Sequence, residues 1–323
     1  MKPVVSVTNI FPEVALKKLS VQCDLRLNES GISLNAEELR VRAAQSTAMI
    51  TYLSDKIDKD IIEAGKSLTI IANYGAGFNN IDVPSAEKMG VWVTNTPRVL
   101  HETTADLTWA MILGGARRIV SAEKFTRDNK FRGWQANLFL GTDVFGKTLG
   151  VIGCGEIGRA VARRAKGFEM KVLYYQRNRL SLEEEERLGA VYTPLRELIQ
   201  NSDFITLHIP LTEETRYLIG EEEFELMKPS AYLIHTARGK VVDDSALLDA
   251  LREGRIAGAA LDVYENEPEL TEGMTELENL MLLPHIGSAS VETRDRMALL
   301  VAENILDALS GKSPRSLVPG WGG

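Results

Sequence analysis

The sequence predicts an α/β protein with two doubly wound parallel sheets. Short apolar runs alternate with helix-like patterns along most of the chain, and a glycine-rich loop follows the first run of the second half. Such alternation is typical of parallel sheets covered by helices. The length of 323 residues, 44% of them hydrophobic, is too great for one comfortable core and suits two domains.

The first hundred residues contain the first series of elements. Short apolar or β-branched runs predict buried strands at VVSVT (4–8), AMITYL (48–53), LTIIANY (68–74) and VWVTN (91–95). Helices are expected between them at 36–45, 57–64 and 84–89, where Pro84 suits a first helical turn. This series therefore predicts one parallel sheet of its own.

The second series begins after residue 148. Strands are expected at 149–153, 171–175, 204–210, 231–237, 256–264 and 280–285. Six strands with crossovers, and a glycine loop after the first of them, match the Rossmann-type nucleotide-binding fold.

Two apolar helices decide how the domains divide. The segment 103–125 is apolar on nearly every side, so we expect one helix buried against more than one surface, serving as domain linker and subunit contact. The segment 288–312 is expected to be an amphipathic helix that packs back on the first domain. The predicted domains are 1–99 with 288–323, for substrate, and 100–287, for NAD(P). The tail 313–323 is expected to be disordered or laid on the surface.

The glycine loop predicts a dinucleotide site. It lies between an apolar strand and a helix-forming stretch, which makes the pattern more informative than glycines alone. Gly153 allows a tight turn, Gly155 lets backbone amides approach a pyrophosphate, and Gly158 lets the helix pack closely on the strand. The phosphates are expected at the positive end of that helix.

The end of the next strand predicts the choice of cofactor. An acidic residue there would bind the ribose 2′-hydroxyl and repel a 2′-phosphate, but this chain has Gln176, followed by Arg177, Asn178 and Arg179. Arginines hold phosphate through paired donors, so NADPH is predicted to be preferred, with NADH possible. The competing interpretation is that both arginines only solvate a strand end.

Composition and charge exclude several other classes. A net charge of -8, a pI near 5.3 and no long basic run argue against a nucleic-acid partner. The acidic run LEEEE (182–186) is interpreted as a solvated helix face. Cys23 and Cys154 predict no disulfide, and no Cys or His cluster has metal-ligand spacing. Without a secretion signal or membrane-length apolar run, the protein is expected to be cytoplasmic and not bound to a membrane.

Three of the four histidines, namely His208, His235 and His285, stand where strands are expected to end. Arg238 follows another strand, and LDVYENEPE (261–269) supplies acids at a sheet edge. One cation, one carboxylate and one imidazole suffice for hydride chemistry on a 2-keto acid, with His285 as the proton donor. Sequence spacing alone does not establish that these groups converge.

Three motifs resemble those of the D-isomer-specific 2-hydroxyacid dehydrogenases, most closely the glyoxylate/hydroxypyruvate reductases: GVIGCGEIGRAVARRAKGFEMKVLYY, HTARGKVVDDSALLDALREGRIAGAALDVYENEP and LLPHIGSAS. The resemblance spans about 1–318. It implies a catalytic triad of Arg238, Glu267 and His285, a flavodoxin-like substrate domain, a two-domain cleft and a homodimer built around 103–120, with Trp134 reaching the partner's site.

The resemblance also implies two sets of binding residues. Substrate contacts are Leu53, Ala76, Gly77, Leu100, Arg238 and His285. Cofactor contacts are Thr104, Gly153, Gly155, Glu156, Ile157, Gly158, Arg177, Asn178, Arg179, His208, Pro210, Thr236, Ala237, Asp262 and Gly287.

Two positions depart from the commonest pattern of the family. His235 replaces the more usual asparagine before TARG, which is expected to alter pocket polarity or pH response. Glu156 stands where a basic residue is frequent, so its side chain is expected to point away from the phosphates. Glu267 argues against formate dehydrogenase activity, because those enzymes pair the histidine with a glutamine.

Several functions remain open from the sequence. Oxidation of phosphoglycerate, D-lactate or phosphite, and reduction of 2-ketogluconate, fit the same fold. A non-catalytic, dinucleotide-sensing relative resembling corepressors is the alternative from another class. Adenosine-type ligand binding, as in methyltransferases, leaves the arginine pair and the triad unexplained.

Overall fold

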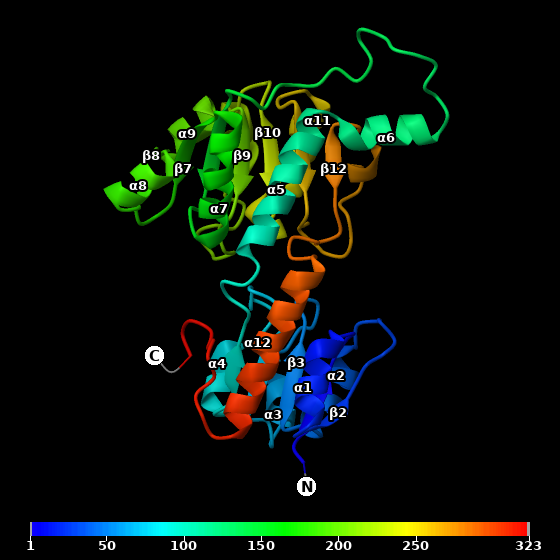
Figure 1. Cartoon of the computed structure of the whole chain (residues 1–323), viewed down its shortest axis with the longest axis vertical. Coiled ribbons are helices and arrows are strands. Elements are labelled where there is room, and N and C mark those ends of the chain that lie inside the picture. The colour runs from blue at the N-terminus through cyan, green and yellow to red at the C-terminus, as the bar shows by residue number, and fades with distance from the viewer. Residues whose placement is uncertain (1, 322–323) are drawn as a thin grey trace. The chain divides into compact units, whose positions relative to one another are not determined.

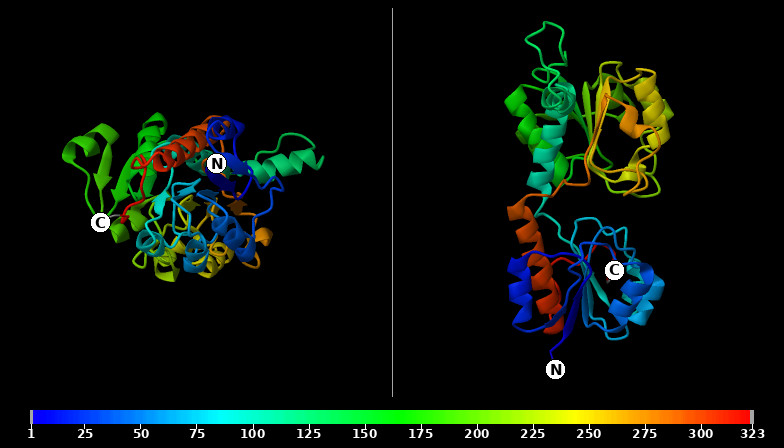
Figure 2. Two further views of the ribbon diagram at one scale, coloured as in Figure 1. Left: turned by 90° about the horizontal axis from the view of Figure 1, so that it is seen from below. Right: turned by 90° about the vertical axis from the view of Figure 1, so that its right-hand side faces the viewer.

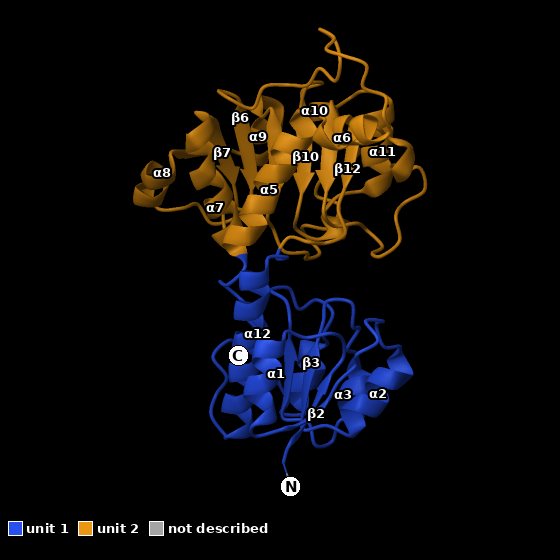
Figure 3. Cartoon of the chain, turned by 45° about the vertical axis from the view of Figure 1, so that its right-hand side comes forward, with its two compact units in different colours: residues 1–100, 288–323 blue, residues 101–287 orange. Residues whose placement is uncertain are grey.

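The computed structural model describes residues 2–321 and forms two compact units. One unit comprises Met1–Leu100 and Ser288–Gly323, and the other comprises His101–Gly287 (Figure 3). The first unit is therefore discontinuous in sequence.

The first unit is built on a five-stranded parallel sheet in the order β2-β1-β3-β4-β5 (Figure 1). The strands are β1 (Val4–Val7), β2 (Asp24–Arg26), β3 (Ala48–Thr51), β4 (Ile70–Asn73) and β5 (Trp92–Thr94). This is the flavodoxin-like order, in which the chain leaves the first strand in one direction and returns to the other side. β2 was not predicted, because its three residues are polar or only partly buried.

Helices cover both faces of this sheet (Figure 2). They are α1 (Glu13–Ser20), α2 (Ala36–Ala44), α3 (Lys59–Ala64), α4 (Val83–Lys88) and α12 (Val291–Leu309). Pro84 lies in the first turn of α4, as predicted, and the side chain of Asp82 caps that helix. An ion pair of 2.7 Å between Lys18 and Glu303 joins α1 to α12.

The tail was expected to be disordered or laid on the surface, and its described part, 313–321, is laid against the edge strand β5. Residues 322 and 323 lie outside the described part. The backbone amide of Val318 donates to the carbonyl of Val93 at 3.0 Å, beside a bridge between Thr94 and Leu317. The indole of Trp321 donates to the carbonyl of Val91 at 2.8 Å. The tail therefore extends the edge of the sheet at β5.

The second unit is built on a seven-stranded parallel sheet in the order β12-β11-β10-β9-β6-β7-β8. The strands are β6 (Thr148–Ile152), β7 (Lys171–Tyr175), β8 (Ala190–Tyr192), β9 (Phe204–Leu207), β10 (Tyr232–His235), β11 (Gly258–Leu261) and β12 (Leu280–Leu282). The strand order reverses between β6 and β9, which are parallel neighbours. Doubly wound sheets bind ligands at such a point. β8 is the strand that the sequence did not predict.

The helices of this unit also lie on both sheet faces (Figure 2). They are α5 (His101–Ala116), α6 (Ile119–Arg127), α7 (Glu156–Ala165), α8 (Leu182–Leu188), α9 (Leu195–Asn201), α10 (Glu221–Leu226) and α11 (Asp244–Arg252), with short 3₁₀ turns at Lys166–Phe168, Gly239–Val241 and Met274–Glu276. The two units confirm the predicted class of two doubly wound parallel sheets.

The segment 103–125 is two helices rather than the single helix predicted. Arg118 adopts a left-handed conformation (φ 52°), which ends α5 and starts α6 in a new direction. Half of α5 is buried within its own unit, against α7 and the sheet, which explains its apolar composition. In contrast, α6 has no buried residue in the described structure.

Candidate active site

The glycine loop connects β6 to α7 at the point where the sheet reverses. Gly153 has φ 92°, and a side chain there would lie 2.5 Å from the carbonyl oxygen of His208. A Cβ on Gly158 would lie 2.0 Å from the carbonyl oxygen of Gly153, whereas one on Gly155 would meet nothing within 4 Å. The loop is thus closely packed on its strand side and open at Gly155.

The start of α7 suits a dinucleotide phosphate. Gly155 is the N-cap residue, without a side chain to bind the first amides of the ten-residue helix, which begins at Glu156. Exposed amides at a helix N-terminus attract anions. Glu156 is exposed in this first turn, and the orientation of its side chain away from the phosphates stays a prediction. The residues present therefore fit a dinucleotide.

The turn after β7 is tied to the glycine loop by Gln176. Its side-chain oxygen accepts from the amide of Cys154 at 3.1 Å, and its side-chain nitrogen donates to the carbonyl of Asn178 at 2.6 Å. Arg177 is exposed and makes no hydrogen bond or ion pair within residues 2–321. The guanidinium of Arg179 is already paired, with both carboxylate oxygens of Glu185 on α8.

The interpretation of the acidic run 182–186 as a solvated face is wrong for two of its members. Glu185 is buried, and Glu184 forms an ion pair of 2.9 Å with Arg159 on α7. Both carboxylates face cations near the predicted dinucleotide site. One usable signal is present in the chain: Glu185 follows Arg179 by only six residues, so a turn between them can bring the two side chains together.

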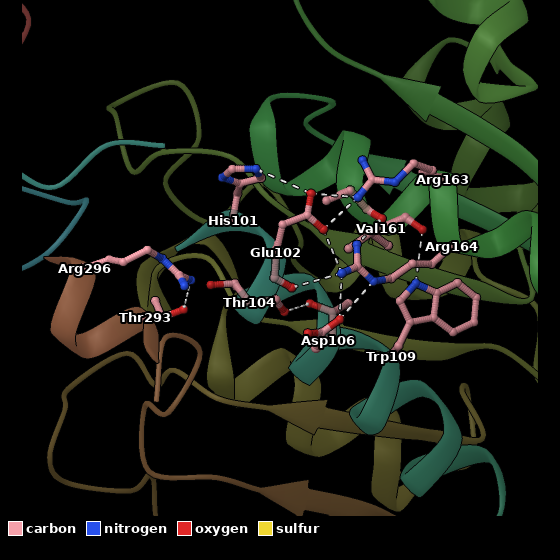
Figure 4. A network of polar contacts seen from close by, with 12 residues as sticks. His101, Glu102, Thr104, Asp106, Trp109, Val161, Arg163, Arg164, Thr293 and Arg296 are labelled. Carbon is pink, nitrogen blue, oxygen red and sulfur yellow. Dashed lines mark hydrogen bonds and ion pairs between the residues drawn. The ribbon is translucent and has the colours of Figure 1, made fainter. Parts of the chain in front are cut away.

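Ion pairs fix α5 against α7 (Figure 4). The carboxylate of Glu102 receives Arg163 at 2.7 Å and Arg164 at 2.8 Å, and Arg164 also pairs with Asp106 at 2.7 Å. The indole of Trp109 donates to the carbonyl of Val161 at 3.1 Å. These contacts hold the first turns of α5, which carry Thr104, in a set position relative to the glycine-loop helix.

At the carboxyl end of the sheet, His285 and Glu267 form a direct pair. Nδ1 of His285 lies 2.7 Å from Oε2 of Glu267, and about a third of each side chain is exposed (31% and 33%). The amide of Tyr264 donates to the other carboxylate oxygen at 3.0 Å. Glu267 is thereby fixed from two sides, and Nε2 is the ring nitrogen of His285 that is left for a ligand.

The charge of Glu267 is set by opposing effects. Burial alone would raise its pKa, but the hydrogen bond from His285, the charge of His285 and the amide of Tyr264 together lower it. The carboxylate is therefore anionic over the working range of pH and stabilises a positive charge on the imidazole ring.

Arg238 follows β10 at the same sheet edge. Burial lowers the pKa of its guanidinium, and the negative charge of Glu267 acts in the opposite direction. Its Nη1 donates to the carbonyl of Ala237 at 2.6 Å. The charge of Glu267 thus acts on both Arg238 and His285. The three residues follow three neighbouring strands, β10, β11 and β12.

Asp244 is a residue of this neighbourhood that the sequence did not single out. It is 2% exposed, and its Oδ2 accepts from the amide of Glu265 at 3.2 Å and from the hydroxyl of Thr271 at 3.0 Å. These two contacts hold both ends of the loop that carries Glu267. The sequence signal was only a second acid at the start of a helix, which helix propensity explains equally well.

Other predicted cofactor residues gather along the same edge. Asp262 is buried and accepts from the amide of Ile286 at 2.7 Å, and a Cβ on Gly287 would lie 3.2 Å from Asp262 and 3.4 Å from Thr104. Burial raises the pKa of Asp262, despite hydrogen bonds from the backbone and the charge of His285. Pro210 and Ala237 follow the ends of β9 and β10.

His235 is the buried last residue of β10, whereas His208 is partly buried and directly follows β9. Burial lowers the pKa of His208 to about 3 and that of His235 to about 4, so both rings are neutral. Nε2 of His235 contacts the carbonyl of Arg238 at 3.0 Å, and Nδ1 of His208 lies 3.4 Å from the hydroxyl of Thr236. His235 therefore supports the backbone of the Arg238 turn rather than facing a ligand.

The predicted substrate residues Leu53, Ala76, Gly77 and Leu100 belong to the first unit. Leu53 follows β3, and Ala76 and Gly77 follow β4, where strands of that sheet end. Asn95 donates to the carbonyl of Ala76 at 2.6 Å, and Asn73 donates to that of Gly77 at 2.7 Å. The amides of Ala76 and Gly77 donate to no protein acceptor in the described part of the chain.

Neither cysteine forms a disulfide in the described structure. Both cysteines are free and buried, and burial raises the pKa of the Cys154 thiol to about 12. No group of three or more His, Cys, Asp or Glu residues within 2–321 could hold a metal ion. Over the same range, no helix combines the length and apolarity needed to cross a membrane.

Comparisons with known proteins identify the family of the chain. Residues 109–287 match the family described as D-isomer specific 2-hydroxyacid dehydrogenase, NAD binding domain. A glyoxylate reductase of Thermococcus onnurineus is 46% identical over 322 residues, covering 98% of this chain and 96% of the relative. A glyoxylate reductase of Korarchaeum cryptofilum is 47% identical over 320 residues, covering 98% and 96%.

Solved structures are similar over the whole chain. The TT0316 protein of Thermus thermophilus has a TM-score of 0.92 at 40% identity, covering 98% of this chain and 99% of its own. An NADPH-dependent glyoxylate/hydroxypyruvate reductase of Sinorhizobium meliloti, in complex with NADP and malonate, has a TM-score of 0.85 at 30% identity, covering 99% and 97%.

The glycine loop, the reversal point of the sheet and the matched family model define an oxidoreductase that uses a nicotinamide dinucleotide. The chain belongs to the D-isomer-specific 2-hydroxyacid dehydrogenase family.

Proposed function

We propose that this protein reduces small 2-keto acids, glyoxylate and hydroxypyruvate foremost, with NADPH as the preferred donor. The observation that carries the proposal is the 2.7 Å contact between His285 and Glu267 at the edge of the dinucleotide-binding sheet. The names of the similar reductases support the substrates.

When bound, the reduced dinucleotide supplies the hydride. The residues of the chain then have separate tasks. The guanidinium of Arg238 binds the substrate carboxylate and polarises the carbonyl group that is reduced. Glu267 holds His285 by Nδ1 and stabilises its protonated form, so Nε2 donates the proton to the carbonyl oxygen. In the first unit, the amides of Ala76 and Gly77 are the proposed donors to a substrate carboxylate.

The turn after β7 supports NADPH as the donor. The side chain of Gln176 accepts a hydrogen bond from the glycine loop. An acidic residue at this position would repel a 2′-phosphate, and Gln176 carries no charge. Arg177 is exposed and forms no ion pair within the described residues, although its charge acts on Glu214, so it is available to a 2′-phosphate. Arg179, although paired with Glu185, has a side chain that is 55% exposed. Residues 177–179 are therefore proposed to bind the 2′-phosphate.

A homodimer is the proposed assembly. Exposed apolar residues of the second unit gather in the segment 119–145: Ile119 (52%), Val120 (56%), Phe131 (51%), Trp134 (86%), Leu140 (67%) and Phe145 (63%). An open groove along α5 and α6 adds to this surface. Such a concentration of apolar side chains is typical of a subunit interface.

Initial rates with glyoxylate, hydroxypyruvate, pyruvate and 2-ketogluconate, each with NADPH and NADH, test the proposed function. We expect glyoxylate or hydroxypyruvate to give the highest kcat/KM, and NADPH to exceed NADH by about tenfold or more, which corresponds to ~1.4 kcal/mol. A preference for NADH contradicts the cofactor. Activity confined to phosphite, D-lactate or phosphoglycerate contradicts the substrate, and dinucleotide binding without turnover indicates a non-catalytic sensor.

A further inference from the structure

We infer that Glu185 is a positioning residue for the cofactor. Its carboxylate holds the guanidinium of Arg179 in place to receive the 2′-phosphate of NADPH. This inference rests on the proposed function and extends it to α8, which none of the sequence motifs connects with the site.

The contact between the two side chains is bidentate. Nε and Nη2 of Arg179 donate to Oε1 and Oε2 of Glu185, each at 2.8 Å. Paired donors in a plane fix the orientation of a guanidinium as well as its position. Arg179 also lies over the ring of Tyr192, with 5.5 Å between the guanidinium carbon and the ring centre. The arginine is therefore restrained on two sides.

Glu185 itself is anchored in the core of the unit. Its side chain is only 11% exposed, and Oε1 also accepts from the hydroxyl of Tyr174 at 2.6 Å. The Tyr174 oxygen accepts in turn from the amide of Leu180 at 2.9 Å. The hydrogen bond from Arg179, followed by that from Tyr174, lowers the pKa of Glu185 to about 2. The anchor is thus an anion at all working pH values.

The restrained guanidinium remains accessible. The side chain of Arg179 is 55% exposed, and the N–H groups that do not face Glu185 are left for another anion. An arginine without such a partner would lose its rotamer freedom when it bound a phosphate, whereas here that freedom is lost on folding. Glu185 should therefore strengthen phosphate binding, provided that this gain exceeds the repulsion between carboxylate and phosphate.

The position of the turn supports a ligand rather than a purely structural role. Gln176 ties the residues just before Arg179 to the glycine loop through the amide of Cys154. On the other side, Glu185 ties Arg179 to α8. The arginine is thus fixed relative to the loop where the dinucleotide phosphates are expected. If the ion pair between Arg179 and Glu185 served only to join α8 to the sheet, the hydrogen bond between Gln176 and the glycine loop would not be needed.

Glu185→Ala and Glu185→Gln test the inference, with Glu186→Gln, an exposed neighbour on the same helix, as the matched control. Binding of adenosine 2′,5′-bisphosphate and of AMP is measured by calorimetry, together with kcat/KM for NADPH and NADH. For Glu185→Ala we expect the Kd of the bisphosphate to rise about tenfold and that of AMP to change by less than about twofold. Glu185→Gln, which keeps the shape and one acceptor, should give an intermediate value, and Glu186→Gln no change.

The outcomes separate the inference from the proposed function. Equal weakening of both nucleotides indicates structural support alone and overturns the inference. Tighter binding of the bisphosphate also overturns it, because repulsion by Glu185 would then dominate. If the unmodified protein binds the bisphosphate no better than AMP, the NADPH preference itself fails. If it discriminates but the variants do so equally well, only the role of Glu185 is lost.

Discussion

The contact between His285 and Glu267 gives the imidazole ring a direction. Because Nδ1 faces the carboxylate, the proton on Nε2 is the one available to a reacting oxygen. Arg238, Glu267 and His285 lie at the ends of different strands, and the loops that carry them are held by buried contacts of Asp244, Tyr264 and His235. The residues that hold the loops are therefore as important to the geometry as those that react.

Replacement of Glu267 by Gln should slow the reduction. The amide has nearly the same shape as the carboxylate but no charge, so His285 loses its anionic partner. We expect kcat at neutral pH to fall by roughly tenfold to a thousandfold. Single-turnover rates of keto-acid reduction with saturating NADPH measure this. An unchanged rate would show that the pair does not control proton donation.

His235→Asn should make the protein less sensitive to acid. The pKa of His235 is depressed from 6.5 to about 4 by burial, so below pH 6.5 the unfolded chain binds a proton that the folded chain does not. The free energy of unfolding therefore falls as the pH drops from 6.5 towards 4. Asparagine keeps a donor for the Arg238 carbonyl without titrating. Between about pH 7 and 4, we expect the unmodified protein to lose on the order of 2–3 kcal/mol more stability than the variant.

Urea unfolding at several pH values measures that difference. Parallel stability curves for the two proteins would show that His235 is not held neutral by the fold.

The residues of the triad could be selected from the sequence only with the help of the family motifs. Strand ends and residue types indicated Arg238 and His285, but several acids between 261 and 269 were equally placed. The roles of Glu185 and Asp244 could not be predicted, because acidic residues in the first turn of a helix are favourable without any tertiary contact. Their burial depends on side chains that return from distant elements.

At the level of elements, two loops meet behind the candidate active site. The turn Gly239–Val241 follows Arg238, and the loop after β11 carries Glu267. A Cβ on Gly239 would lie 1.7 Å from the carbonyl oxygen of Tyr264, so the two backbones touch at a point where only glycine fits. This contact fixes how closely the two loops approach each other.

Gly239→Ala should therefore lower kcat/KM for the keto acid. The added methyl group must push the turn away from Tyr264, which displaces Arg238 from Glu267. We expect kcat/KM for the keto acid to fall by roughly tenfold to a hundredfold. Gly167→Ala is the matched control, because a Cβ there meets nothing within 4 Å. Activity of the Gly239 variant equal to that of the control would mean that the loops adjust without cost.

The apolar strands could be predicted because burial on both faces leaves continuous apolar runs. β2 and β8 lack such runs: they are edge strands of three residues with exposed positions. The break between α5 and α6 was also missed. It depends on a left-handed backbone at Arg118, a position occupied by neither glycine nor proline.

For the whole molecule, the described chain forms two units, each with a parallel sheet and its own core. The assignment of substrate binding to the first unit and of cofactor binding to the second remains a prediction. The apolar segment 119–145 belongs to the second unit, and packing within that unit leaves its large side chains exposed. A second copy of the chain is the proposed partner for this segment.

The double variant Ile119→Asp with Val120→Asp tests the dimer. These side chains are 52% and 56% exposed, so the charges should be tolerated by an isolated chain but not within an apolar interface. By light scattering, we expect the unmodified protein to have twice the mass of one chain and the variant to be a monomer. Ile32→Asp, 73% exposed in the first unit, should remain a dimer. A monomeric unmodified protein would contradict the assembly.

The most direct test of the central claim is single-turnover oxidation of bound NADPH by glyoxylate in His285→Ala. The account predicts a rate lower by roughly 10²–10⁴, because the proton donor is lost, with the Kd for NADPH nearly unchanged. A rate close to that of the unmodified protein, with NADPH fully bound, would contradict it and assign proton donation to another group.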